Sequence, residues 1–108
     1  MASKNEDTLA SLANKIDMLK IVFGNELLTR IQEYTPVRTG LLRDSWVLNF
    51  DEEAKMITLT NTATNRGVPY AIYVEEGTRH MAGFFMLLRT MNDAESLLED
   101  AMDQVGLD

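Results

Sequence analysis

The chain of 108 residues contains no cysteine, only two prolines and a single histidine, His80. Without cysteine it has no disulfide, no thiolate nucleophile and no cysteine-based zinc site. No apolar run approaches the roughly 18–20 residues needed to cross a bilayer, so we expect no membrane span. The length suits a single domain over residues 1–108. A domain of this size buries only about two-thirds of its unfolded surface, so association with copies of itself or with partners would add stability.

Basic residues are also scarce at one end of the chain. The net charge is −7, and the last eighteen residues carry six acidic side chains and no basic one. A protein that binds duplex DNA needs clustered lysine and arginine to displace counterions from the phosphates. The sequence has no such cluster, so we expect no sequence-specific binding to nucleic acid. An acidic surface would instead repel DNA that moves past it.

Apolar residues at intervals of three or four predict one long amphipathic helix over residues 8–34. We expect residues 1–7 to be flexible and Asp7 or Thr8 to cap the helix start. Gly24 inside the helix indicates a bend, a close contact or simply a tolerated glycine. Pro36 ends the helix, because the residue before a proline avoids helical dihedral angles. The apolar stripe comprises Leu9, Leu12, Ile16, Leu19, Phe23, Leu27, Ile31 and Tyr34.

The rest of the chain predicts a small antiparallel sheet and a second long helix. Alternation of apolar and polar residues indicates a β-hairpin over residues 45–61, with a polar turn at 51–55. Residues 62–69 read as a loop, and residues 70–76 fit either a short helix or a third strand. A helical pattern returns over residues 84–105, with Gly106 as its C-terminal cap. The expected fold is α+β, a small antiparallel sheet packed with the N-terminal and C-terminal helices. A two-stranded sheet is barely stable alone, so further strands are expected from the loops or from a neighbouring copy.

Residues that could carry chemistry are few. His80 is the one candidate for acid–base catalysis, and no nucleophile motif accompanies it. Glu75 and Glu76 are adjacent, so their side chains point in different directions and do not form a catalytic pair. The glycines lack any phosphate-binding spacing. We therefore predict no catalytic, cofactor-binding or metal site, and an exposed loop position for His80.

Two segments are more distinctive than the rest of the chain. The first is residues 35–46, Thr-Pro-Val-Arg-Thr-Gly-Leu-Leu-Arg-Asp-Ser-Trp. Thr39 can cap a brief helical turn, and Gly40 allows a tight backbone. Leu41 or Leu42 then attaches this turn to the core. Arg43 offers a planar guanidinium that suits a carboxylate.

The second segment is residues 70–79, Tyr-Ala-Ile-Tyr-Val-Glu-Glu-Gly-Thr-Arg. A short helix there would bury Tyr70 and Val74, which lie four residues apart. Glu75 would then be free to meet an arginine such as Arg38 or Arg43. Alternatively, both segments have only a structural role, as turns that connect the main elements of the fold.

Taken together, the two segments resemble the tail-component family of tailed bacteriophages, small neck and tail-completion proteins of the head–tail joint. The family pattern is Thr-Pro-Val-x-Thr-Gly-x-Leu-Arg-x-Ser, a β-hairpin, Tyr-Ala-x-x-Val-Glu-x-Gly-Thr and a final helix. The resemblance covers about residues 8–105. Two positions depart from it, because Arg38 stands where an acidic residue is frequent and residues 81–86 lack the family's Arg-Pro-Phe. The matching residues are Thr35, Pro36, Val37, Thr39, Gly40, Leu42, Arg43, Ser45, Tyr70, Ala71, Val74, Glu75, Gly77 and Thr78. All of them except Val37 are also the candidate subunit-interface residues.

This resemblance implies a structural role in the virion, with assembly in the host cytoplasm. Related proteins form rings between the portal-side connector, or stopper, and the tail tube, and join the tail to the DNA-filled head. Rings of this kind close through heterologous contacts, and we expect six copies, with twelve as the alternative. DNA would pass through the ring without a specific contact.

Two other functions fit parts of the sequence. The acidic C-terminal end is compatible with a small regulator or inhibitor that binds a basic host protein. His80 leaves a hydrolase as the remaining alternative. If the structural role is right, His80→Ala should leave every property of the protein unchanged.

Overall fold

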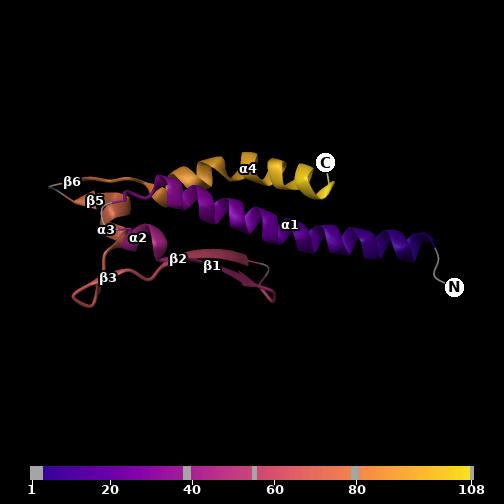
Figure 1. Cartoon of the computed structure of the whole chain (residues 1–108), viewed down its shortest axis with the longest axis horizontal. Helices are drawn as coiled ribbons and strands as arrows, with labels where there is room; N and C mark the ends of the chain where they lie inside the picture. Colours follow the sequence, from indigo (N-terminus) through magenta and orange to yellow (C-terminus); the bar gives the residue numbers. More distant parts are fainter. Residues whose placement is uncertain (1–3, 38–39, 55, 79–80, 108) are drawn as a thin grey trace.

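The structure is a computed structural model that describes residues 4–37, 40–54, 56–78 and 81–107. Two long helices dominate it, α1 (Lys4–Tyr34) and α4 (Met86–Val105). A hairpin of β1 (Trp46–Asp51) and β2 (Met56–Asn61) lies along α1, and α4 lies on another side of α1 (Figure 1). This arrangement confirms the expected α+β fold.

Shorter elements connect the hairpin to the helices. One turn of helix, α2 (Leu41–Asp44), precedes β1, and a six-residue helix, α3 (Ala71–Glu76), follows the hairpin. Two small hairpins pair β3 (Thr64–Asn65) with β4 (Val68–Pro69), and β5 (Gly77–Thr78) with β6 (Met81–Ala82). All three sheets of the described chain have two antiparallel strands. Residues 70–76, which the sequence left open between helix and strand, are therefore largely helical.

Two expectations about the start of α1 differ from the structure. The helix begins at Lys4, so residues 4–7 are helical, and the expectation of flexibility for residues 1–3 falls outside the described chain. Because Asp7 and Thr8 lie inside the helix, neither caps its start. Their low helix propensity is overridden by the favourable residues that follow. At the other end, the helix stops at Tyr34, two residues before Pro36, as predicted.

The core lies where the C-terminal part of α1 meets the rest of the chain. Its buried residues come from five segments and are Ile31, Leu42, Trp46, Ala63 and Met86. Gly24 shows a close contact, because a Cβ at this position would lie 2.8 Å from Leu48 Cδ2. The glycine thus lets the hairpin approach the helix.

Among the described residues, no other helix packs along the N-terminal third of α1 (Figure 1). Lys15 Nζ donates to the carbonyl of Gly106 at 3.3 Å, just beyond the end of α4. Before Lys15, α1 projects past α4, which gives the molecule a length of 66 Å (Figure 1). In the described part of the chain, no helix combines the length and the apolar character of a membrane span.

Candidate functional site

Thr35, the first residue after α1, joins this helix to the hairpin. Its hydroxyl donates to the carbonyl of Ile31 at 2.6 Å and accepts a hydrogen bond from Trp46 Nε1 at 2.8 Å. The side chain is only 3% exposed. A buried hydroxyl and a buried indole N–H both need partners, and here each satisfies the other. The threonine of the first motif therefore fixes the position of β1 against the end of α1.

The turn at residues 40–45 holds the two ends of the hairpin together. Gly40 has φ +83°, a conformation that favours glycine, and its carbonyl accepts the Asp44 amide at 2.9 Å. Leu42 is buried, whereas its neighbour Leu41 is exposed. The Leu42 carbonyl accepts Asn61 Nδ2 at 2.8 Å from the end of β2. The expected tight turn, attached to the core through Leu42, is thus present.

Glu75 in α3 occupies a position that the sequence did not predict. Its carboxylate accepts the backbone amides of Leu87 at 2.8 Å and Leu88 at 3.2 Å, in the first turn of α4. These amides have no partner inside the helix, and a negative charge there also interacts favourably with the helix dipole. The expectation that Glu75 meets Arg43 is wrong, because Arg43 Nε lies 3.3 Å from Asp44 Oδ1 instead. The other expected partner, Arg38, lies outside the described residues.

The residues just before α4 also form backbone hydrogen bonds to the end of α3. The amides of Phe84 and Phe85 donate to the carbonyls of Val74 and Glu75 at 2.8 and 3.0 Å. Gly83 makes this approach sterically feasible, because a Cβ there would lie 2.6 Å from the Glu75 carbonyl oxygen. The end of α3 and the start of α4 therefore satisfy each other's free backbone groups. This junction replaces the Arg-Pro-Phe segment that the family pattern would place before the last helix.

The two motifs meet in the core. Leu42 and Trp46 from the first motif pack with Ile31 and Met86, and the partly buried side chains of the second motif surround this cluster. The latter are Tyr70, Ala71 and Val74. Thr78 at the end of the second motif is exposed, and Thr39 lies outside the described residues. Most of the motif side chains therefore determine the fold of the subunit itself.

A polar contact between the long helices was not predicted from the sequence. Asp93 Oδ2 in α4 accepts Arg30 Nη1 at 3.2 Å and also accepts the Tyr34 hydroxyl, both from α1. Arg89 lies over the Tyr34 ring at 5.7 Å. The pKa of Arg30 is raised, first by hydrogen bonding to Tyr34 and then by the charges of Asp93 and Glu33. The spacing of residues within one helix cannot predict these contacts, because Asp93 comes 59 residues after Tyr34 and 63 residues after Arg30 in the chain.

The described residues contain no group of three acidic, histidine or cysteine side chains that could hold a metal ion. His80, the one candidate for acid–base catalysis, lies outside the described residues. The arrangement described above joins elements of the fold through hydrogen bonds and apolar packing.

Comparison with known proteins identifies the family. A family model described as "Bacteriophage HK97-gp10, putative tail-component" matches residues 7–77. The match runs from α1 to the start of β5, and it contains the first motif and the second motif up to Gly77. Neither a curated protein nor a solved structure matches the chain. Because the model matches about two-thirds of the sequence, the chain belongs to the HK97-gp10-like family of bacteriophage tail components.

Proposed function

We propose that the protein is a structural component of the neck or of the completed tail end, and that its copies form a ring at the head–tail junction. Its partners would be the portal-side connector or stopper and the tail-tube protein, and DNA would pass through the ring. The family membership supports a structural role in the virion over the acidic-regulator and hydrolase alternatives. The formation of a ring is supported by apolar side chains that are exposed on the surface of the subunit.

The observation that carries this proposal is the apolar stripe on the N-terminal part of α1. Leu9, Leu12 and Ile16 continue the face that buries Leu27 and Ile31, yet they are 65%, 43% and 41% exposed. The same face of α1 is therefore buried in the core near the C-terminal end of the helix and exposed near its N-terminal end. A soluble subunit rarely leaves such a stripe open unless another molecule covers it.

Six copies are favoured over twelve, as in the rings that the family resemblance implies. Donor and acceptor surfaces that lie on different sides of a subunit produce a heterologous contact, which closes a ring when the rotation fits. The motif residues would act mainly by shaping the subunit.

A phage with a nonsense mutation in this gene tests the proposal. Infected cells should accumulate DNA-filled heads and separate tails, and the wild-type gene supplied in trans should restore joined particles. Normal numbers of stable, tailed and infectious particles without the protein would contradict it.

A further inference from the structure

In the described part of the chain, the two strands of the β1–β2 hairpin pair only with each other, so the outward-pointing backbone groups along both edges can still form hydrogen bonds. The register pairs Leu48 with Leu59 and Phe50 with Ile57. Just beyond the strands, the Thr62 amide donates to the carbonyl of Ser45 at 3.1 Å, so Ser45 and Thr62 form a hydrogen-bonded pair of the ladder. In an antiparallel ladder the bonded pairs alternate with non-bonded ones, so the backbone groups of these four ladder residues point outward.

These outward groups are unused within the described chain. No backbone partner outside the hairpin is found for Leu48 and Phe50 on the β1 edge, or for Ile57 and Leu59 on the β2 edge, among the described residues. Proteins usually block an open edge with proline, with lysine or with a bulge. Neither six-residue strand contains proline, lysine or arginine, and the register is continuous. Both edges therefore remain able to pair with a further strand.

Each edge is also flanked by a groove, which is largely apolar beside β2 and mixed in polarity beside β1. Beside β2, a groove of about 290 Å³ separates the hairpin from α4. Its floor is formed by Phe23 and Leu27 of α1, and its walls include Leu59 and Met91. A strand added to the β2 edge would place alternate side chains over this groove.

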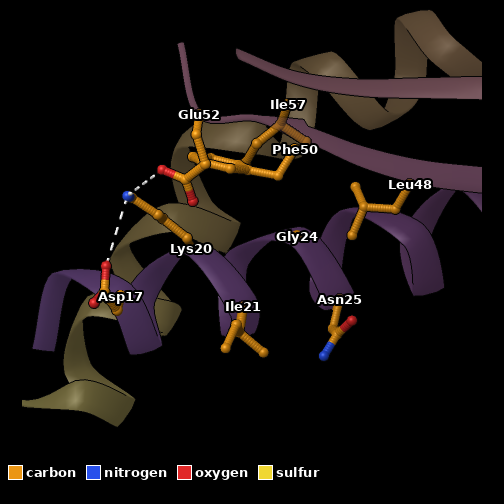
Figure 2. A pocket seen from close by; sticks show the side chains of 9 residues that line it. All are labelled: Asp17, Lys20, Ile21, Gly24, Asn25, Leu48, Phe50, Glu52 and Ile57. Atoms are coloured by element: carbon orange, nitrogen blue, oxygen red, sulfur yellow. Dashed lines mark ion pairs between the residues drawn. The ribbon is translucent and has the colours of Figure 1, made fainter. Parts of the chain in front are cut away.

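The groove beside β1 lies on the other side of the hairpin and holds about 420 Å³ (Figure 2). Leu48 extends over Gly24, while Ile21 is exposed at the open side. Lys20 spans the end of the groove, with its Nζ 3.7 Å from Asp17 and 3.6 Å from Glu52. The two grooves thus differ in their lining: one is formed by the hairpin and α1, and the other by the hairpin, α1 and α4.

We propose that the β2 edge of one copy pairs with the β1 edge of the next, so that a continuous antiparallel sheet runs from subunit to subunit. The occupant of each edge is a second copy of this chain, and the inference rests on the ring proposed above. The two edges have the same length, six residues each. A symmetric β2–β2 contact would leave both β1 edges open, whereas head-to-tail pairing in a closed ring uses every edge.

Single-cysteine variants test the pairing, because the natural chain contains no cysteine. Asn49 and Thr58 are mid-strand positions on the face of the hairpin that points away from α1. N49C and T58C protein are mixed, assembled and treated with a short bismaleimide. We expect clearly more covalent dimer in the mixture than in either variant alone, because equal positions of two copies lie two strands, or about 10 Å, apart. A mixture of N49C with E99C, a position exposed on α4, serves as the control and should give no more than N49C alone.

The outcomes separate the inference from the proposed function. If rings form but the N49C and T58C mixture gives no more covalent dimer than either variant alone, the edge pairing is wrong while the ring stands. More dimer in T58C alone than in the mixture would show a symmetric contact and overturn the head-to-tail arrangement. If neither variant nor the natural protein assembles in the presence of the tail tube, the ring itself is refuted, and the edge pairing with it.

Hydrogen exchange provides a second readout that needs no substitution. On assembly, the outward amides of Ile57 and Leu59 should exchange at least about tenfold more slowly. The amides of Thr58 and Thr60 already bond to β1, so assembly should change their exchange much less. Unchanged exchange at Ile57 and Leu59 in assembled particles would overturn the pairing.

Discussion

The carboxylate of Glu75 accepts the backbone amide of Leu87 at 2.8 Å and thereby caps a helix that begins eleven residues later in the chain. The residue at the cap position itself, Phe85, has φ +50° and makes no side-chain cap bond. A residue of the second family motif thus supplies the cap that the last helix lacks. This gives a structural reason why an acidic residue suits the motif.

Replacing Glu75 tests this cap. Glu75→Ala should lower the free energy of unfolding by about 1–2 kcal/mol, because two amides lose their acceptor. Glu75→Gln keeps an oxygen acceptor and should cost less. The measurement is urea unfolding followed by circular dichroism. Glu76→Ala, at the exposed neighbouring position, is the matched control; if it destabilises the protein as much as Glu75→Ala does, the cap is not the cause.

Gly83→Ala should be among the most damaging single-methyl additions in the chain. The new Cβ would lie 2.6 Å from the Glu75 carbonyl oxygen, a backbone atom that cannot move without opening the α3–α4 junction. We expect a loss of about 1–3 kcal/mol, the usual cost of overpacking. Gly67→Ala is the comparison, because no atom lies within 4 Å of its Cβ and only its φ of +79° opposes the change. Equal thermal stability of the Gly83 variant and the natural protein would show that α3 and the segment before α4 do not pack this closely.

Thr35→Val should destabilise the protein by about 1–3 kcal/mol. Valine keeps the shape but removes the hydroxyl, so the buried Trp46 indole N–H loses its acceptor. Thr35→Ser retains the hydroxyl and should restore most of the stability. Trp46 is the only tryptophan, so its fluorescence reports the change at the site while denaturant unfolding measures the energy. Indistinguishable unfolding of the valine and serine variants would show that the hydrogen bond contributes little.

Leu12→Glu should impair assembly but not folding. The side chain is already half exposed in the subunit, so a charge costs the isolated chain little, whereas it would oppose burial against a neighbour. Ser11→Glu adds the same charge at an exposed position on another face of α1. Sedimentation velocity should show a lower assembled fraction for Leu12→Glu alone. Normal assembly of this variant would mean that the apolar stripe is not covered in the ring.

Local sequence patterns predicted the long elements well, because their signals are periodic. The stripe from Leu9 to Tyr34 belongs to one helix, and alternation around Trp46 and Leu59 gave the hairpin. Residues 70–76 stayed ambiguous, since a six-residue window is too short to separate a buried strand from a helix turn.

The contacts between elements could not be read from local patterns. Glu75 was expected beside an arginine, but its partners are two backbone amides, which have no sequence signature. Asp93 is one of the six acidic residues near the C-terminal end, yet it pairs with Arg30 and Tyr34. Such partners follow from how the helices are packed, and that packing is a tertiary property.

The arrangement of the ring can be seen by electron cryomicroscopy of intact virions. We expect a closed ring of six copies between the portal-side connector and the tail tube, with β1 of each copy beside β2 of the next. Density that places this chain elsewhere in the particle, or as isolated copies at the junction, would contradict it.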